Sequence, residues 1–596
     1  MLKHYSLLVV LGLTMQLVTS QSFKVHSHND YLQEVPFWSA YANGINSIEI
    51  DVFLKEGNLY VAHDESDILP HRTLQTLYLQ PIVAMKSLEL GKGQSLQFLI
   101  DIKSEPYATL NQLKLVLDEY PKIVNDRSIS IVISGNRPKV EDYFNYPPYI
   151  TFDYQSLEAP KNSEIWDKVA LISLSFKNFS SWNGKGRLTI EDYKKVKSTI
   201  DKAHSYNKPF RFWGTPDSKT AWKAFVDLGV DYINTDMPYA STSYLNTLSD
   251  RVYNNKETSE VYVPTYKTDQ KDTEVKNIIL LIGDGNGLSQ ISSSTLANGG
   301  ALSLTQFKSI GLLKTQSADD FTTDSAAAGT ALATGVKTNN RAIGVDSLGN
   351  KVLNLTELLH EKGFVSGCIT TDEITGATPS TFYAHRRDRS DREGIILDLY
   401  KSKLSLLIGG GGASVSGGIK ETGFIIEEHS DQIETRKEER VAHFFSQGGV
   451  PSVLEGRGAV LAKATRNGIT FLNNKNKPFF LMVEGAQIDS YGHHNNVPGI
   501  VSEGIDFDRA ITEAVKFADA SGNTLVIVTA DHETSGFTIP QGNLQNRTIE
   551  GDFTTEDHTA VMVPIFAYGP QSQAFQGVYD NYSVFTKILQ VLNVQE

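Results

Sequence analysis

The first half of the chain alternates between short apolar runs and longer stretches with helical spacing. The apolar runs are rich in β-branched and aromatic residues, which is typical of strands. We expect strands at residues 23–28, 47–53, 97–103, 128–134, 149–153, 169–176, 209–213 and 231–235. Strand–helix units of this number and length predict a (β/α)8 barrel, the TIM barrel, whose active site lies at the C-terminal ends of the strands.

A second series of apolar runs begins after a polar segment. These runs are apolar at nearly every position, as expected of parallel strands buried on both faces. They occupy residues 277–283, 310–315, 365–371, 404–408, 478–483, 524–529 and 563–568. With helices between them they predict an α/β sandwich around a mostly parallel central sheet.

The polar segment 251–275 has no sustained periodicity, which predicts a linker between a barrel at 21–250 and a second domain at 276–596. The charged region 421–440 is interpreted as a solvated helix, with an insertion near the entrance of the second domain as the alternative.

The N-terminus has the pattern of a secretory signal peptide. Lys3 and His4 precede an apolar run at 7–18, and small residues stand before Gln21. We therefore expect residues 1–20 to be cleaved and the protein to be secreted or periplasmic. No later stretch is long and apolar enough to predict a membrane-spanning segment. With one cysteine, Cys368, the chain forms no intrachain disulfide.

The 596 residues carry a formal net charge of −14, which argues against a nucleic-acid-binding surface. The sequence gives no indication of the oligomeric state.

Polar residues gather where the predicted barrel strands end. Glu49 and Asp51 are two residues apart on one strand, so their carboxylates point to the same face. Like charges paired on an inward face need a cation, and oxygen ligands favour Ca²⁺ or Mg²⁺. Two acids on a solvated strand face are the alternative. Other strand ends carry His28, Asp101, Lys103 and Asp236, whereas His26, His71 and His204 lack this spacing and are interpreted as ordinary histidines.

These residues resemble the glycerophosphodiester phosphodiesterase and phosphatidylinositol-specific phospholipase C superfamily. The shared pattern consists of His28, Glu49-Ile50-Asp51, His63-Asp64, Asp101-Ile102-Lys103, Trp213 and Asn234-Thr235-Asp236. The resemblance implies that Glu49, Asp51 and Asp101 bind one Ca²⁺ or Mg²⁺. It also implies that His28 and His63 act as general base and acid, that Lys103 contacts the phosphate, and that Trp213 binds substrate.

The barrel also departs from that superfamily. Asn29-Asp30 stands where Arg-Gly usually follows the first histidine, and Asp101 stands where many members have Glu. Two interpretations therefore remain, a working phosphodiesterase and a barrel that only binds a ligand.

Candidate metal ligands stand beside the predicted strands of the second half. They are Asp284, Glu484, Asp489, His493, Asp531, His532 and His558. Aspartate and histidine together suit Zn²⁺, and a catalytic zinc keeps one open position. In the stretch 323–335, Ser325 precedes a run of small helix-forming residues. A serine at such a helix N-terminus is either a cap or a nucleophile facing an anion.

The second half resembles the alkaline phosphatases over essentially its whole length. The resemblance implies a first zinc on Asp489, His493 and His558, and a second zinc on Asp284, Asp531 and His532. Ser325 would be the nucleophile, and Thr378 and Glu484 would join Asp284 around one Mg²⁺. Arg389 would hold the phosphate, although Arg386 and Arg387 stand nearby. Gly376, where an aspartate often supports the magnesium, and Ser490, where Lys or His is frequent, depart from the bacterial pattern.

Together the two resemblances imply an exported, bifunctional phosphoesterase that acts on small-molecule phosphoesters. The barrel would cut a phosphodiester, and the phosphatase would release phosphate from the monoester. The alternative is a phosphatase with a barrel that only binds its ligand. A noncatalytic scaffold would require both metal patterns to be accidental.

Overall fold

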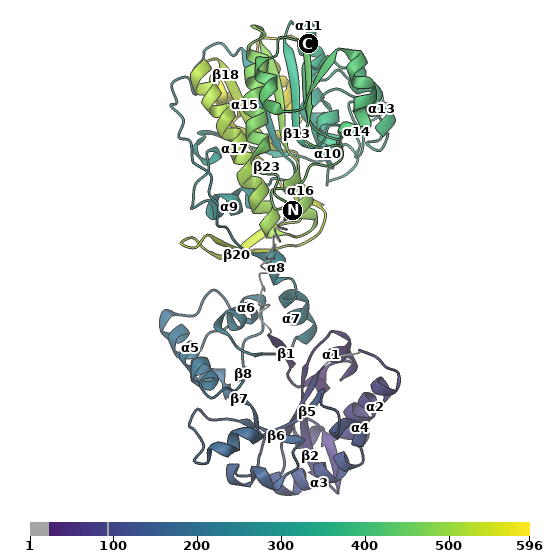
Figure 1. The fold of residues 1–596 in the computed structure, drawn as a ribbon, viewed down its shortest axis with the longest axis vertical. Coiled ribbons are helices and arrows are strands. Elements are labelled where there is room, and N and C mark those ends of the chain that lie inside the picture. Colours follow the sequence, from purple (N-terminus) through teal and green to yellow (C-terminus); the bar gives the residue numbers. More distant parts are fainter. Residues whose placement is uncertain (1–22, 92–94, 596) are drawn as a thin grey trace, which may run out of the picture. The chain divides into compact units, whose positions relative to one another are not determined.

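The computed structural model describes residues 23–91 and 95–595, so the predicted signal peptide at 1–20 lies outside the described part of the chain. The chain divides into two compact units, Met1–Thr247 and Leu248–Glu596. Each is described separately below (Figure 1).

The first unit is the predicted (β/α)8 barrel. Eight parallel strands follow one another in the order β1-β9-β8-β7-β6-β5-β4-β2, and pairing of β1 with β2 closes the ring. All eight predicted strands are present, and their bounds are β1 (Lys24–Ser27), β2 (Ser47–Lys55), β4 (Leu96–Ile102), β5 (Ile129–Gly135), β6 (Ile150–Tyr154), β7 (Val169–Ser175), β8 (Phe210–Trp213) and β9 (Tyr232–Thr235). A further strand, β3 (Asn58–Val61), pairs antiparallel with the end of β2 and was not predicted.

Helices cover the outside of this barrel (Figure 1). They are α1 (Trp38–Ala42), α2 (Gln80–Ser87), α3 (Pro106–Asp118), α4 (Pro121–Val124), α5 (Ile190–His204), α6 (Lys219–Leu228) and α7 (Pro238–Leu245). Part of the interior is an apolar cluster of Leu99, Val132, Leu171 and Tyr232, one residue from each of four strands. Because side chains alternate along a strand, the same strands can present polar residues at their C-terminal ends.

The second unit is built on a ten-stranded sheet with the order β15-β16-β14-β13-β17-β11-β18-β23-β12-β24. Its strands are β11 (Asn277–Gly283), β12 (Ser309–Lys314), β13 (Val365–Glu373), β14 (Leu406–Gly410), β15 (Phe424–Glu427), β16 (Arg440–Phe444), β17 (Phe479–Gly485), β18 (Thr524–Ala530), β23 (Val563–Tyr568) and β24 (Gly577–Asp580). Only β23 runs against its neighbours, pairing antiparallel with β18 and β12. The prediction of a mostly parallel sheet is therefore confirmed.

Helices lie on both faces of this sheet (Figure 1). The main ones are α9 (Leu288–Ala297), α10 (Ser325–Thr334), α11 (Leu355–Glu361), α12 (Ala377–Ser380), α13 (Arg392–Lys401), α14 (Gly412–Ile419), α15 (Val460–Asn473), α16 (Gln487–His493), α17 (Val497–Ser521) and α18 (Ser583–Val591). The central strand β11 shows why both faces are covered. Ile278, Leu280 and Ile282 belong to one buried apolar cluster, and Ile279 and Leu281 to another. Both faces of the strand are thus removed from water, which explains its continuous apolar run.

The predicted linker is part of the second unit rather than a free connection. After α8 (Leu248–Arg251), the strand β10 (Val252–Asn254) pairs with β21 (Thr548–Asp552), which also pairs with β20 (Thr538–Asn543). Further along, the Tyr262 hydroxyl and the Thr265 amide both donate to Asp519. These contacts anchor residues 252–265 although they lack hydrophobic periodicity.

The interpretation of residues 421–440 as a solvated helix is wrong. This region contains β15, a short 3-10 helix (Ser430–Thr435) and the start of β16, at one edge of the large sheet. The two strands are short, and the charged residues between them at 428–439 hid their apolar pattern.

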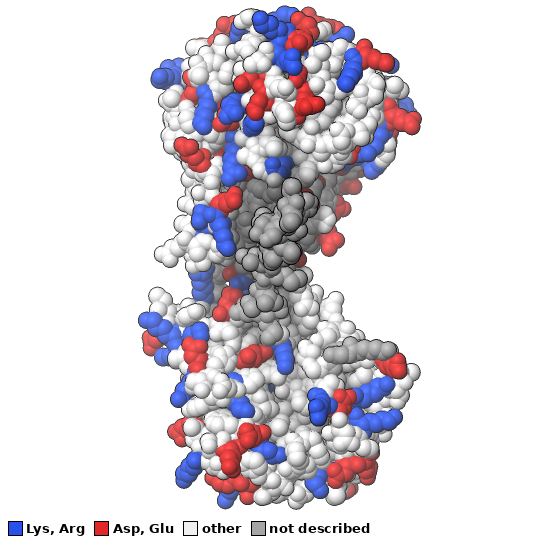
Figure 2. All heavy atoms as spheres, viewed as in Figure 1, with Lys and Arg blue, Asp and Glu red and all other residues white. Residues whose placement is uncertain are grey.

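No helix in the described ranges is long and apolar enough to cross a membrane. On the face drawn in Figure 2, acidic and basic side chains are interspersed on both units.

Candidate active sites

The acids of the second unit meet because their strands are neighbours. The strand β11 lies between β17 and β18, and Gly283 is in register with Gly485 and Ala530. Asp284 and Asp531, which directly follow these positions, therefore come to the same edge of the sheet, together with Glu484. All three acids are buried. The C-terminal edge of a parallel sheet is where α/β folds bind ligands.

Ser325 is the first residue of α10 and is not its cap. The Asp324 side chain accepts the amide hydrogen of Ala327 at 2.9 Å and so caps the helix. The Ser325 hydroxyl instead lies 3.3 Å from Nε2 of His532. Of the two interpretations left open by the sequence, this geometry favours a serine directed into the site.

The three histidines use the same ring nitrogen for positioning. Nδ1 of His493 lies 2.6 Å from the Glu556 carbonyl oxygen, and Nδ1 of His558 lies 2.8 Å from the Thr323 carbonyl oxygen. Nδ1 of His532 lies 3.2 Å from the Thr534 hydroxyl. A hydrogen bond from Nδ1 to a carbonyl fixes the tautomer in which Nε2 offers a lone pair, as in metal-ligating histidines.

The Nε2 atoms and the acids form two groups with the spacing of metal ligands. Asp489 and His493, one turn apart on α16, converge with His558, and a second group consists of Asp284, Asp489 and His532. Asp531, which the resemblance assigns to the second zinc, lies beside this second group, with its Oδ2 atom 3.3 Å from Nε2 of His532.

Unpaired oxygens show that these groups suit cations. The buried atoms Oδ1 of Asp284 and Oδ2 of Asp531 have no hydrogen-bond partner among the described residues. Burial and the adjacent Asp531 charge raise the pKa of Asp284 well above its usual value. Both atoms lie within 3.4 Å of the single imidazole nitrogen Nε2 of His532, and buried acids clustered in this way are costly unless further positive charge compensates them.

Beside these groups lie the residues assigned to magnesium and phosphate. Oγ1 of Thr378 is buried and has no described partner, and burial raises the pKa of Glu484 to about 8. Nη1 of Arg389 lies 3.1 Å from Oδ2 of Asp324, next to Ser325. In contrast, Arg386 contacts Asp398 and the Gly394 carbonyl, and Arg387 contacts the Leu348 carbonyl.

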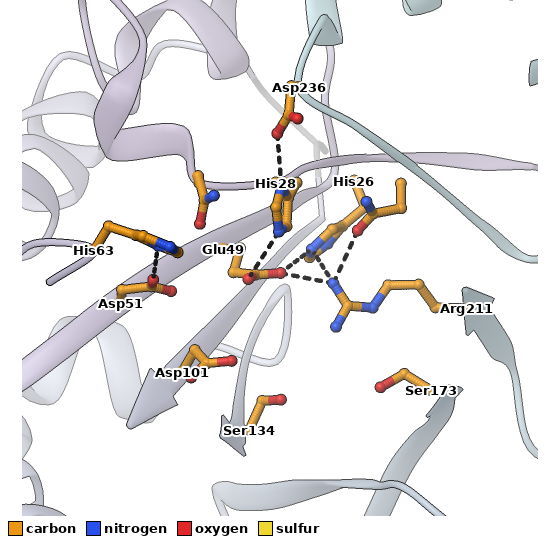
Figure 3. A network of polar contacts seen from close by, with 12 residues as sticks. His26, His28, Glu49, Asp51, His63, Asp101, Ser134, Ser173, Arg211 and Asp236 are labelled. Carbon is orange, nitrogen blue, oxygen red and sulfur yellow. Dashed lines mark hydrogen bonds and ion pairs between the residues drawn. The ribbon is translucent and has the colours of Figure 1, made fainter. Parts of the chain in front are cut away.

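In the barrel, Glu49 and Asp51 within β2 converge with Asp101 near the end of the adjacent β4 (Figure 3). Asp51 and Asp101 are directly opposite each other in the register of these strands. Lys103 lies between them, with Nζ 3.0 Å from Asp51 and 3.2 Å from Asp101. Burial raises the pKa of Asp101 to about 6 although Lys103 is adjacent. Gly135 makes room for this acid, because a Cβ there would lie 2.1 Å from Oδ1 of Asp101.

The two predicted acid–base histidines lie beside different carboxylates, His63 next to Asp51 and His28 next to Glu49 (Figure 3). Nδ1 of His28 is 2.6 Å from Oδ1 of Asp236, and its Nε2 is 3.7 Å from Glu49. Nδ1 of His63 is 3.1 Å from Oδ2 of Asp51. Trp213, at the end of β8, is 40% exposed, so it is accessible to a ligand at the barrel mouth.

Two residues that the sequence analysis missed lie beneath the carboxylates. The Arg211 guanidinium is buried, with Nη1 2.7 Å from Glu49 and 2.6 Å from Nε2 of His26. His26, interpreted above as ordinary, is fully buried 2.8 Å from Glu49. Burial alone would raise the pKa of Glu49, but the Arg211 charge and the hydrogen bond with His26 hold it below its usual range. The sequence did contain a signal for both residues. His26 stands two residues before His28, and Arg211 stands two residues before Trp213.

A cavity of about 620 Å³ lies beside the barrel mouth. It is formed where the chain leaves β7 and β8, and it is lined by Phe176, Lys177, Ser180, Ser181, Trp182, Gly214, Thr215 and Pro216. Its volume is within the range of small-molecule sites.

The alkaline phosphatase family profile matches residues 275–411 and 424–550. Alkaline phosphatase 4 of Bacillus subtilis is 31% identical over 414 residues, covering 54% of this chain and 90% of that protein. The alkaline phosphatase from the Antarctic bacterium TAB5 is 40% identical, with a TM-score of 0.52, and covers 54% of this chain and 100% of its own. Mutants of that enzyme have been solved with Mg bound.

The first unit has matches of its own. The AIM6-like phosphodiesterase domain matches residues 16–92, and the glycerophosphoryl diester phosphodiesterase family matches 209–239. Altered inheritance of mitochondria protein 6 of Kluyveromyces lactis is 30% identical over 292 residues, covering 36% of this chain and 70% of that protein. Both resemblances stated from the sequence are confirmed, and the chain belongs to the alkaline phosphatase family, with a phosphodiesterase-like barrel preceding its phosphatase domain.

Proposed function

We propose that this protein is an exported enzyme with two phosphoester-cleaving sites that act in sequence. The barrel hydrolyses a glycerophosphodiester or a related lipid headgroup, and the second unit removes phosphate from the resulting monoester. The observation that carries the proposal is that each unit has its own converging set of candidate metal ligands.

In the second unit, Ser325 attacks the phosphorus atom in line and becomes a phosphoserine, while the alcohol departs. Arg389 holds two phosphate oxygens with its planar guanidinium. Water then releases phosphate from Ser325. Two Zn²⁺ held by the aspartate and histidine groups would stabilise the attacking and leaving oxygens, and Asp284, Thr378 and Glu484 would hold one Mg²⁺.

In the barrel, Glu49, Asp51 and Asp101 would hold one Ca²⁺ or Mg²⁺, which would neutralise the charge on the transferring phosphate. His28, oriented by Asp236, removes a proton from the attacking water, and His63 donates one to the leaving alcohol, which gives the monoester. The cavity beside Trp213 is large enough to hold the alcohol group of the diester.

The phosphoserine is tested by mixing the protein with an aryl phosphate and quenching in acid. Peptide mapping should place phosphate on Ser325, and Ser325→Ala should carry none. Phosphate on another residue, or release of phosphate by Ser325→Ala at the unmutated rate, would refute the mechanism.

A second candidate is a phosphatase with a barrel that only binds its ligand. It is favoured by one observation: Lys103 and Arg211 already ion-pair with all three barrel carboxylates. The unmutated protein decides between the two. Diester cleavage that depends on added Ca²⁺ or Mg²⁺ supports a catalytic barrel, whereas saturable binding without cleavage supports the alternative.

Export is proposed from the N-terminal pattern alone. N-terminal sequencing of protein recovered outside the cytoplasm should begin at Gln21. A mature chain that still begins at Met1 would contradict it.

A further inference from the structure

The space beside Gly376 is filled by the carboxylate of Asp372. The strand β13 ends at Glu373, and a turn closed by the 2.8 Å bond from the Gly376 amide to the Glu373 carbonyl folds the chain back. A Cβ at position 376 would lie 1.9 Å from Oδ2 of Asp372. Gly376 has φ −60° and ψ 167°, a conformation open to any residue. The glycine is therefore required by the position of Asp372 and not by the backbone.

Hydrogen bonds hold Asp372 on the side of Glu484. Oδ1 of Asp372 accepts the Glu373 amide hydrogen at 2.7 Å, and the Asp372 amide donates to the Thr370 hydroxyl at 2.8 Å. That hydroxyl in turn donates to Oε2 of Glu484, which is opposite Thr370 in the register of β13 and β17. Oδ2 of Asp372 makes no hydrogen bond within the described residues.

The cations close enough to act on the Asp372 charge are Arg389 and Arg392, and Arg392 is already paired with Glu373. Nearby, Oγ1 of Thr378, a residue only 1% exposed, and Oδ1 of Asp284 are buried without described partners. These oxygens have the chemistry of a site for a hard divalent cation.

We propose that Asp372 supplies an additional carboxylate to the cation site of Asp284, Thr378 and Glu484, and that Gly376 is what admits it. The inference rests on the magnesium site of the proposed function. Mg²⁺ retains several waters, so an acid at the margin of its site can act on a bound water. An acid is accommodated at position 372 or at position 376, but the two would collide.

The test exchanges the position of the acid. Asp372→Asn keeps an oxygen for the Glu373 amide but removes the charge, and it should weaken Mg²⁺ binding about 10- to 100-fold. Gly376→Asp alone should also weaken binding, because its side chain displaces Asp372. The double variant Asp372→Ala with Gly376→Asp should bind Mg²⁺ more tightly than Asp372→Ala. Glu373→Gln is the matched control, because its carboxylate is paired with Arg392 at 2.7 Å, and it should leave binding unchanged.

The readout is Mg²⁺ bound per chain after equilibrium dialysis at fixed zinc, with zinc content and the unfolding midpoint without Mg²⁺ as folding controls. The inference is overturned if Asp372→Asn binds Mg²⁺ as tightly as the unmutated protein, or if the double variant does no better than Asp372→Ala. If the unmutated protein binds no more Mg²⁺ than Glu484→Gln, the proposed magnesium site fails and this inference fails with it.

Discussion

The barrel pairs its clustered carboxylates with lysine and arginine, whereas the phosphatase centre pairs its own with histidines. Lys103 pairs with Asp51 and Asp101, and buried Arg211 pairs with Glu49. In the phosphatase centre the ion pairs described for Asp284, Asp489 and Asp531 are all with histidines. A histidine that serves as a metal ligand is neutral and brings no compensating charge.

This difference separates two ways of building a site for a phosphoester. The barrel carboxylates are already paired with lysine and arginine side chains. A bound metal would be added to this existing arrangement. The phosphatase centre concentrates buried acids whose partners are imidazoles, so we expect its stability to depend on bound cations. The predictions below test this contrast, from the largest expected effect to the smallest.

The largest effect is expected from His532→Ala in the phosphatase centre. This histidine is fully buried beside Ser325, and losing several kcal/mol of transition-state stabilisation lowers kcat/KM for an aryl phosphate about a thousandfold or more. Cleavage of a phosphodiester should be unchanged. Ser490→Ala, on the exposed side of α16, is the control. Retention of more than a tenth of the phosphatase activity would contradict the assignment.

The corresponding change in the barrel is His63→Ala. Loss of a general acid should lower the rate of diester cleavage about 10²- to 10⁴-fold while hydrolysis of glycerol phosphate continues. His71, exposed and outside the carboxylate cluster, provides the matched control His71→Ala. Equal diester cleavage by both variants would show that His63 takes no part in the chemistry.

Arg211→Met tests whether the barrel relies on its own cation. The substitution leaves Glu49 buried without its counter-ion and should lower the free energy of unfolding of the barrel by about 3–5 kcal/mol. All five tryptophans lie between Trp38 and Trp222, so tryptophan fluorescence reports on the barrel alone. Arg389→Met, at a partly exposed ion pair, should change stability by less than about 1 kcal/mol. Equal effects of the two substitutions would remove the contrast.

Chelation should affect the two units unequally. When the free ion concentration is about 100 times the Kd, removing the ion lowers the free energy of unfolding by about 2.7 kcal/mol. We expect this loss in the phosphatase transition followed by circular dichroism, with a smaller change in the barrel transition followed by tryptophan fluorescence. Equal destabilisation of both transitions would show that the barrel depends on its metal as much as the phosphatase does.

Most of the fold was predictable because strands buried on both faces are continuous apolar runs. The bounds of β11 and β23 agree with the prediction residue for residue. The strands β15 and β16 were missed, since each is short and a charged segment at 428–439 separates them. The segment 252–265 was taken for a linker because side-chain hydrogen bonds and a short strand, rather than an apolar face, attach it to the second unit.

The site residues found from the sequence are those whose side-chain type and position beside a strand suffice. Arg211 was missed because its role depends on burial against Glu49, and the residues next to it in the sequence do not reveal that contact. An arginine inside an apolar strand was nevertheless a signal. Asp372 was missed because a turn, and not proximity in sequence, brings it beside Gly376. The absence of an acid at Gly376 was visible, but its replacement from another position was not.

The most direct test of the two-step account follows the products of Ser325→Ala. The variant is given glycerophosphoinositol and glycerophosphocholine, and monoester and free phosphate are measured separately. The account predicts that monoester accumulates without release of phosphate, whereas the unmutated protein releases phosphate from the same diesters. If these diesters survive intact while the unmutated protein still dephosphorylates glycerol phosphate, the barrel does not supply the phosphatase with their monoesters, and the sequential account is contradicted.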